Sequence, residues 1–476
     1  MKRFFRALFV AAAVAIAACG PCERTVVLLS TNDIHANILR FPQLAAAVGA
    51  CRDTADLVVL LDAGDRWTGE AYVDRAPVPG MPVVALMNRL GYDAATLGNH
   101  EFDHGQAFLG RMIDSMEFAV VCANVVSDTC TFPKLPPYAV VERGGLKIGV
   151  VGVVTNYEGP GHPAGKRSSF EGLEFPDPQQ AAIRWAEALR PEVDLLVLVS
   201  HMGDDRDAEL LAREGRYDVV IGGHTHELRD TVVNGTLLTQ TGKKLANVGV
   251  TKIRMRGRKV AGIDYELVPL DAYAPDAEFR RQVDGYFADP VLSEPAGTFA
   301  RTADKAGLAN WMASSLAADA KADIGIYHIG GVRLDGIDAG DVTKGRIYNL
   351  EPFGTLIATM RMTPAQLRGM ILTKYNEQTR EGHRIDLIAT VPYTVVTDAQ
   401  DRAVDVLFPT LREGKKYRIA ITDYVFANYD GLTYDDGTVT KRAVADVLLE
   451  RLKSGGPVEP DNRPLQGTVV AETVRP

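Results

Sequence analysis

The stretch LGNHEFDHG, residues 97–105, places an amide, two imidazoles and two carboxyl groups directly after a short apolar run. Asn99 offers an amide oxygen, a weak metal ligand that becomes useful beside stronger ligands. His100 is followed three residues later by Asp103, and a carboxylate beside an imidazole fixes the tautomer and charge needed for proton transfer. The loop therefore predicts metal binding and acid–base chemistry, provided that further ligands lie nearby.

Ligand-type side chains also follow four other apolar runs. They are Asp33 and His35 after residues 25–30, Asp65 after 56–62, His201 after 194–200, and His224 and His226 after 217–221. In an open α/β sheet, the loops at the carboxyl ends of the strands meet at one edge and form the ligand site. Imidazoles and carboxylates together suit divalent ions such as Zn²⁺ and Mn²⁺. Counting Asn99, seven ligands exceed the demand of one ion, so we expect two ions about 3.5–4 Å apart that share Asp65, the spacing used for displacement at phosphorus.

The elements that position these loops follow from the pattern of the apolar runs. The runs are short, β-branched and continuously apolar, which predicts strands buried on both faces. Between them, MPVVALMNRLGY, with Pro82 in its first turn, and DPQQAAIRWAEALR predict helices. The alternation predicts a layered α/β domain with two packed sheets. Four glycines allow sharp turns beside the ligands: Gly64, Gly98, Gly222 and Gly223.

Four segments are expected along the 476 residues. They are a signal peptide (1–18), a catalytic α/β domain (24–272), a more polar connecting helix or linker (273–297) and a second α/β domain (298–476). The landmarks of the last are ADIGIYHIGGVR (322–333), EPFGTLI (351–357) and YRIAITDYVFANYDG (417–431). The net charge of −9 and the lack of a basic stripe exclude nucleic acid as a surface-bound partner.

The N-terminus predicts export. Lys2, Arg3 and Arg6 precede an apolar run that is too short to span a bilayer but suits a secretory signal. The residues IAAC, 16–19, resemble the bacterial lipobox, which implies cleavage before Cys19 and a lipid anchor on its sulfur. The alternative is a soluble periplasmic protein cut nearby. In either case the chain is expected in the periplasm or at the cell surface.

Four cysteines remain after such processing: Cys22, Cys51, Cys122 and Cys130. In an oxidising compartment they permit two disulfides in three pairings. The short spacing between Cys122 and Cys130 favours that pair. A buried thiol at Cys122, ending a strand, is the alternative.

The segments TNDIHAN, AGDRWTG, LGNHEFDHG, SHMGDD and IGGHTHE together resemble the motifs of the calcineurin-like metallophosphoesterases. GGVR, EPFG and YDG extend the resemblance to the 5′-nucleotidase and UDP-sugar hydrolase family within them, from about residue 24 to near the C-terminus. The implied fold is a four-layer sandwich, with two packed mixed sheets flanked by helices, followed by a smaller α/β C-terminal domain that binds the substrate.

The resemblance also implies roles for individual residues. Asp33, His35, Asp65 and His226 would hold one metal ion, and Asp65, Asn99, His201 and His224 the other. A hydroxide shared by both ions would attack the phosphorus. His100, oriented by Asp103, would stabilise the phosphoryl group or protonate the leaving oxygen. Glu101 and His104 receive no role and are expected to be polar loop residues.

The second domain departs from the nucleoside site of the family. Leu387 and Leu432 stand where two aromatic rings sandwich the base, and aliphatic side chains do not stack on a purine in the same way. Other family asparagines correspond to His328 or Ile329 and to Thr355. Four residues are expected to contact the substrate: Arg333, Phe353, Tyr429 and Asp430.

The sequence therefore predicts an exported, lipid-anchored phosphohydrolase with two divalent metal ions. Its expected substrate is a small phosphoester, a 5′-nucleotide first, and its membrane contact is the lipid on Cys19 alone. A cyclic phosphodiesterase or a sulfur-compound hydrolase with the same metal centre is the alternative among enzymes. A ligand-binding lipoprotein without turnover is the alternative outside them, although such a protein has no need of the His100–Asp103 pair.

Overall fold

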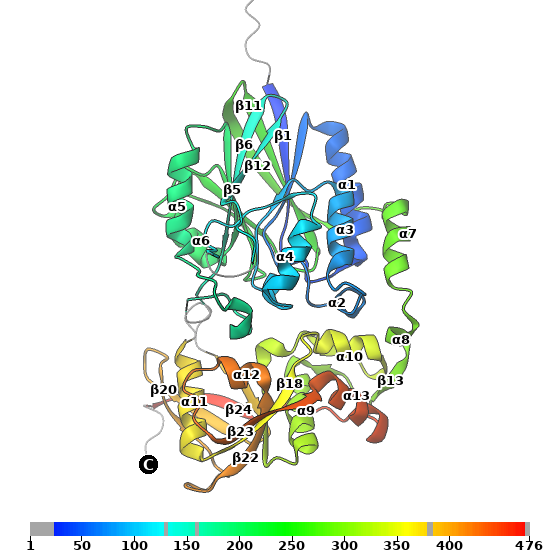
Figure 1. Ribbon diagram of the computed structural model, residues 1–476, viewed down its shortest axis with the longest axis vertical. Coiled ribbons are helices and arrows are strands. Elements are labelled where there is room, and N and C mark those ends of the chain that lie inside the picture. Colours follow the sequence, from blue (N-terminus) through cyan, green and yellow to red (C-terminus); the bar gives the residue numbers. More distant parts are fainter. Residues whose placement is uncertain (1–22, 128–131, 158–160, 378–383, 472–476) are drawn as a thin grey trace, which may run out of the picture.

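The computed structural model describes residues 23–127, 132–157, 161–377 and 384–471. The described chain forms two α/β domains, an upper one in blue to green and a lower one in yellow-green to red (Figure 1). Helices α7 (Ala277–Tyr286) and α8 (Pro290–Ser293) connect the domains along one side of the molecule. The fold is thus the predicted one.

Two six-stranded mixed sheets form the centre of the first domain. The first has the order β12 (Lys259–Pro269), β11 (Asn247–Arg256), β1 (Glu23–Thr31), β2 (Leu57–Asp62), β3 (Ala94–Ala95), β4 (Ala119–Val120). The second has the order β5 (Tyr138–Arg143), β6 (Leu146–Val154), β7 (Leu195–His201), β8 (Val219–Gly222), β10 (Thr236–Thr241), β9 (Leu228–Val233). Strands β1 to β3 are parallel, and so are β7 and β8, so the loops that follow them leave each sheet at one edge.

Burial on both faces explains the continuous apolar runs. In β1, Val26 and Leu28 enter the core between the two sheets, whereas Val27 and Leu29 pack with the residues of the outer helices. Helices α1 (Phe41–Thr54), α3 (Met81–Leu90) and α4 (Gln106–Asp114) cover the first sheet, and α5 (Pro178–Leu189) and α6 (Asp204–Leu211) cover the second. Each such aliphatic side chain contributes about 1.5–3 kcal/mol to the stability of the fold when it is buried. The strands whose ends carry the site therefore also hold the four layers together.

The helices and strands near the site begin and end for local reasons. Pro82 lies in the first turn of α3, as predicted, where its missing N–H costs nothing. Asp177 caps α5 by accepting a hydrogen bond from the Gln180 N–H at 2.8 Å. Strand β3 is shorter than the predicted 93–97, because the chain turns into the LGNHEFD loop directly after Thr96, whose N–H still donates to Asp62 O.

The second domain is built on a five-stranded sheet with the order β19 (Leu387–Ala389), β15 (Ile324–His328), β22 (Tyr417–Thr422), β18 (Leu356–Met362), β23 (Asp435–Ala443). The other strands form a three-stranded sheet and two pairs. The sheet has the order β21 (Ala403–Leu407), β20 (Tyr393–Thr397), β24 (Gln466–Val470), and the pairs are β13 (Pro295–Phe299) with β17 (Gly340–Thr343) and β14 (Ala303–Asp304) with β16 (Gly336–Ile337). Helices α9 (Lys305–Ala320), α10 (Lys344–Leu350) and α13 (Val444–Ser454) share one core, and α11 (Pro364–Glu377) lies in the other, with α12 (Asp423–Asn428) facing the first domain.

The connecting helix α7 packs on the first domain, where Phe279 and Val283 join the same core as α1. No helix within the described ranges is both long and apolar enough to cross a membrane. The predicted signal peptide with Cys19 lies outside the described residues, as do Cys22 and Cys130. Of the remaining cysteines, Cys51 is partly buried and Cys122 is buried with its thiol 3.5 Å from Asn124 Oδ1, and neither forms a disulfide with another described residue. The predicted Cys122–Cys130 pair involves a residue outside the described ranges and stays a prediction.

Candidate metal centre and interdomain cleft

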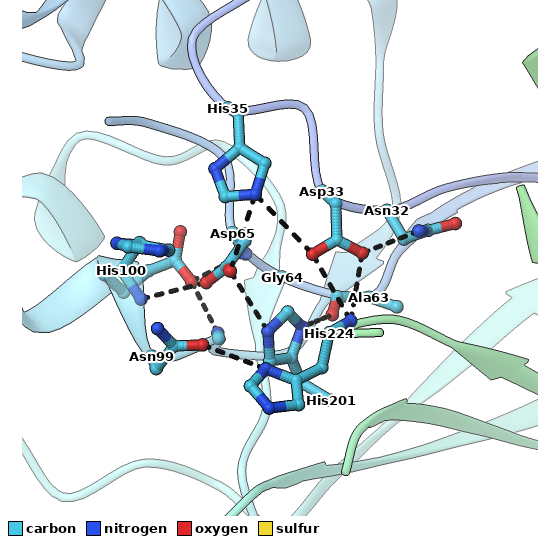
Figure 2. A network of polar contacts seen from close by, with 12 residues as sticks. Asn32, Asp33, His35, Ala63, Gly64, Asp65, Asn99, His100, His201 and His224 are labelled. Atoms are coloured by element: carbon cyan, nitrogen blue, oxygen red, sulfur yellow. Dashed lines mark hydrogen bonds and ion pairs between the residues drawn. The ribbon is translucent and has the colours of Figure 1, made fainter. Parts of the chain in front are cut away.

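The structure brings all seven predicted metal ligands together at the carboxyl edge of the two sheets. Figure 2 labels all of them except His226, which lies beside Asp33 and His35. His35 Nε2 lies 3.8 Å from Asp33 Oδ1 and 3.9 Å from Asp65 Oδ2. The other separations are 3.4 Å between His226 Nε2 and Asp33 Oδ1, 3.2 Å between His201 Nε2 and Asp65 Oδ2, and 3.1 Å between His224 Nδ1 and Asn99 Oδ1. Asp65 is thus flanked by His35 on one side and His201 on the other.

The hydrogen bonds of the histidines fit a metal site. His201 Nδ1 lies 2.6 Å from Ala63 O, and because a carbonyl only accepts, this contact places the hydrogen on Nδ1 and leaves the lone pair on Nε2. That lone pair points at the Asp65 carboxylate from a fully buried ring, and Nε2 has no hydrogen-bond partner among the described residues. The Nε2 atoms of His35 and His226 likewise face each other at 3.0 Å. Atoms of these types face one another in this way where a cation lies between them.

The local electrostatics also call for positive charge. Burial opposes a charge on His201, but the Asp65 carboxylate outweighs it and raises the pKa of this imidazole to about 10. Without a metal ion, Nε2 therefore takes up a proton, and a bound metal ion would displace that proton and use the lone pair. Burial likewise opposes the ionised form of Asp65, yet the surrounding imidazoles hold the pKa of this carboxyl well below its usual range. Burial and the nearby Arg333 lower the pKa of His35, which keeps it in the neutral form that binds metals.

Backbone conformation marks the same residues. Five of the seven ligands have positive φ angles, namely Asp33 (49°), His35 (45°), Asp65 (57°), His224 (83°) and His226 (62°). Few residues other than glycine adopt this region, and such conformations gather at functional sites where the surrounding structure enforces them. The backbone is therefore shaped to aim these side chains inward.

His100 and Asp103 form the predicted pair beside the ligands. His100 Nδ1 lies 2.7 Å from Asp103 Oδ2, and the His100 N–H donates to Asp65 Oδ1 at 2.9 Å. Two further residues support this pair and were not predicted. The Thr68 hydroxyl donates to the same Asp103 oxygen at 2.7 Å, and the Asp74 carboxylate accepts from the Thr68 N–H at 3.0 Å. No spacing in the sequence identifies them, because both act through a loop that folds back on the ligands.

The interpretation of Glu101 as a polar loop residue was wrong. Its side chain is fully buried, and its carboxylate accepts hydrogen bonds from the backbone N–H groups of Asp65, Arg66 and Gly98. Its neighbour His104 is exposed, with its ring near Phe108, as a polar loop residue would be.

A cleft of about 450 Å³ lies between the two domains, with the ligand cluster on one wall. Arg333 and Phe353 reach into it from the second domain. Arg333 Nη2 lies 3.3 Å from His35 Nδ1, and the Phe353 ring lies parallel to His100 with 5.9 Å between centroids. Two of the four predicted substrate contacts therefore touch the first-domain site directly.

The far wall of the cleft carries aromatic and polar side chains. His328 stacks on Tyr424 with 4.8 Å between centroids, and the Tyr429 hydroxyl donates to Asp386. Tyr424 was not predicted, because only the fold places α12 at the cleft.

Three positions that the sequence analysis singled out in this domain lie outside the cleft lining. Leu387 is 2% exposed within the core, and Leu432 packs partly buried against the same core. Asp430 pairs with Arg167 of the first domain, with 2.6 Å between Oδ1 and Nη2.

Comparisons with known proteins agree with this architecture. A family model for the calcineurin-like phosphoesterases matches residues 27–228, and one for the 5′-nucleotidase C-terminal domain matches residues 290–436. The 5′-nucleotidase of Vibrio cholerae is 24% identical over 480 residues, which cover 87% of this chain and 85% of that protein. The trifunctional nucleotide phosphoesterase protein YfkN of Bacillus subtilis is 26% identical over 474 residues, covering 85% of this chain. This chain spans only 32% of the length of YfkN.

The crystal structure of a 5′-nucleotidase precursor from Thermus thermophilus has the same fold, with a TM-score of 0.81 at 22% identity, and covers 95% of this chain and 100% of that one. The fold and the ligand edge thus define a two-domain metallophosphoesterase. The chain thus carries a calcineurin-like phosphoesterase domain followed by a 5′-nucleotidase C-terminal domain, and the two models together assign it to the 5′-nucleotidase family of the calcineurin-like phosphoesterases.

Proposed function

We propose that this chain is a phosphohydrolase that uses two divalent metal ions to remove phosphate from 5′-nucleotides or related phosphomonoesters. The convergence of seven ligand-type side chains, with Asp65 at their centre, beside the His100–Asp103 pair is the observation that carries the proposal. A ligand-binding protein without turnover needs neither the pair nor its support by Thr68.

The residues divide into two ligand sets that share Asp65. Asp33, His35, Asp65 and His226 form one set, and Asp65, Asn99, His201 and His224 form the other. Zn²⁺ and Mn²⁺ suit this mixture of imidazole, carboxylate and amide oxygen. Two such ions, when bound, supply a water molecule of lowered pKa and positive charge for the phosphoryl oxygens.

The residues around the ligands have separate tasks. Burial opposes a charge on His100, but Asp103 and Asp65 outweigh it and raise the pKa of this imidazole, which favours the protonated ring. Asp103 fixes the hydrogen on Nδ1, so Nε2 is the atom that protonates the leaving oxygen or bonds to the phosphoryl group. Arg333 brings a guanidinium to the same end of the cleft, where it binds the phosphate. Phe353 holds the plane of the His100 ring by stacking on it.

The cleft accepts a small organic phosphate. Its volume of about 450 Å³ lies within the range of about 300–1,000 Å³ usual for small-molecule sites. Tyr424 and Tyr429 offer ring surfaces opposite the ligands, and His328 and Asp386 offer polar atoms. A nucleoside fits these chemistries, and two of the relatives compared above are named for action on nucleotides.

Export completes the proposal. The cationic start, the apolar run and the residues IAAC favour secretion with lipid attachment to Cys19. Mass spectrometry of the membrane fraction would show a lipidated Cys19 at the new N-terminus. A Cys19→Ala variant would then be found in the soluble exported fraction, and an unprocessed chain would exclude the anchor.

The activity is tested with purified protein loaded with Mn²⁺ or Zn²⁺. Release of phosphate or alcohol is measured for nucleoside 5′-monophosphates, sugar phosphates, a cyclic nucleotide and sulfur esters. We expect the highest kcat/KM for the nucleoside 5′-monophosphates. A preference for the cyclic or sulfur compounds would replace the substrate but keep the metal centre. Binding of nucleotides without turnover in either metal would overturn the enzyme proposal.

A further inference from the structure

A buried polar network lies directly beneath the ligands and contains none of them. It consists of Glu101, Arg66 and Asp62, whose side chains are all fully buried. Buried charges are costly unless they are paired and hydrogen-bonded. The partners of these three side chains therefore show what the network holds in place.

Glu101 joins two loops through its two carboxylate oxygens. Oε2 accepts from the Asp65 N–H at 2.9 Å and from the Gly98 N–H, and Oε1 accepts from the Arg66 N–H at 2.9 Å. Asp65 and Arg66 belong to the loop after β2, and Gly98 to the loop after β3 that continues to Asn99. One side chain therefore ties the loop of the shared ligand to the loop of the amide ligand.

The two loops approach each other backbone to backbone. A Cβ atom on Gly98 would lie 2.6 Å from Asp65 N and closer still to Asp65 Oδ1, and one on Gly64 would lie 2.5 Å from Gly98 N. No side chain fits at this crossing, so the N–H groups there find their acceptor in Glu101. Buried N–H groups without an acceptor are rare, which makes this acceptor necessary for the crossing.

Arg66 pairs with Glu101 and contacts the ends of the two neighbouring strands. Its Nε lies 3.6 Å from Glu101 Oε1, and its Nη1 donates to Asp62 Oδ1 at 3.1 Å and to Thr96 O at 2.7 Å. Asp62 ends β2 and Thr96 follows β3, so the network fixes both strand ends against each other as well as the loops.

We propose that Glu101 is a positioning residue that sets the Asp65 carboxylate relative to Asn99 and so decides whether the second metal ion binds. This inference rests on the proposed two-metal function. Asp65 and Asn99 both belong to the second ligand set, so a shift between their loops weakens that set. The first set shares Asp65 but is held without Glu101, because the His35 N–H donates to Asp65 O and the Asp33 N–H to Gly64 O, each at 3.0 Å.

The test is the Glu101→Gln variant, which keeps the shape of the side chain but turns one acceptor into a donor facing N–H groups. Mn²⁺ binding is measured by calorimetry and by electron paramagnetic resonance of the full chain, with Glu117→Gln as an exposed control of the same chemistry. We expect the first ion to bind as in the wild type and the second about 10–100-fold more weakly. The spectrum of a coupled pair should give way to that of isolated Mn²⁺ ions, whereas the control keeps both ions.

Thermal unfolding of the metal-free proteins shows whether the variant is folded. If Glu101→Gln does not fold, Glu101→Asp decides, because it keeps the charge but is too short to reach both loops. Unchanged affinity for the second ion and an unchanged coupled spectrum would overturn the inference, as would an equal loss of both ions. A wild-type chain that binds fewer than two ions would instead overturn the two-metal proposal itself.

Discussion

The His100 imidazole lies among groups that each fix one of its properties. Asp103 holds Nδ1, Asp65 accepts from its backbone N–H, and Phe353 stacks on its ring. None of these contacts involves the atom that the proposed chemistry uses, Nε2. A substitution of His100 therefore tests catalysis without disturbing metal binding, which a substitution of a metal ligand does not.

We expect His100→Asn to lower kcat by about 10²–10⁴-fold, the range for loss of a general acid. Metal content should stay at the wild-type level, because His100 belongs to neither proposed ligand set. Asp103→Asn should lower kcat by a smaller factor, since it disturbs only the tautomer and charge of the ring. Phosphate-release kinetics and elemental analysis of the same samples check both. A His100→Asn protein with wild-type kcat would remove this residue from the mechanism.

For individual residues, the sequence was sufficient to predict the site where a side chain of metal-ligand type stands at the end of a recognisable strand. Asp33, His201 and His226 have metal-binding side chains and stand at the ends of recognisable strands, so their meeting was predictable. Glu101 stands in the same motif, but its role depends on N–H groups of two loops that only the folded chain brings together. Tyr424 depends likewise on where a short helix lies relative to another domain.

At the scale of secondary-structure elements, the loops after β2 and β3 cross at two glycines, Gly64 and Gly98, with no room for a side chain. The strand ends of β2 and β3 were predicted from their apolar runs, but the closeness of their loops was not, since it depends on register and on the twist of the sheet. Gly98 is the position where this closeness is most demanding.

We expect Gly98→Ala to reduce activity at least about 100-fold, because its Cβ would displace the Asp65 backbone and carboxylate. The overpacking should also destabilise the fold by about 1–3 kcal/mol. Gly49→Ala is the matched control, since a Cβ there, on helix α1, meets nothing within 4 Å. That variant should keep full activity and gain about 0.5–1 kcal/mol. Equal activity in the two variants would contradict the tight crossing.

The end of helix α10 carries a buried carboxyl group that makes stability depend on pH. Glu351 is 1% exposed, and its Oε1 accepts from the Thr355 hydroxyl while Oε2 has no hydrogen-bond partner among the described residues. Burial raises the pKa of Glu351 to about 7. The folded state therefore prefers the neutral acid, and its stability falls as the pH rises from the unfolded pKa of about 4.3 through about 7.

We expect Glu351→Gln to remove this dependence, because the amide keeps the acceptor for Thr355 and carries no charge. The variant should match the wild type below pH 4.5 and exceed it by about 3 kcal/mol above pH 7, as the raised pKa of Glu351 implies. Urea unfolding of both proteins across this range measures the difference. If the two curves stay parallel, Glu351 is ionised in the folded protein and the prediction fails.

At the scale of the whole molecule, contacts on two sides of the cleft hold the domains together. On the side of the connecting helices, the Ala71 N–H donates to Asn349 Oδ1 at 2.6 Å, and Asn349 Nδ2 donates to Glu70 Oε2 at 3.0 Å. On the other side, Arg167 donates to Asp430 at 2.6 Å and its N–H to Asn428 Oδ1 at 2.8 Å. These contacts place Arg333 and Phe353 against the first-domain ligands.

The variants Arg167→Ala and Asn349→Ala, alone and combined, remove these contacts between the domains. The exposed Arg167–Asp430 ion pair contributes about 0–1 kcal/mol, and a hydrogen bond such as those of Asn349 contributes about 1 kcal/mol, so each loss changes the population of the closed form by a factor of about 5. Because apparent affinity scales with the fraction of the competent form, KM for the preferred phosphoester should rise by up to about 5-fold in each single variant and further in the double variant. The first-domain ligands are untouched, so metal content should not change. Small-angle scattering should show a larger radius of gyration for the double variant, and unchanged scattering with unchanged KM would mean that other contacts close the cleft.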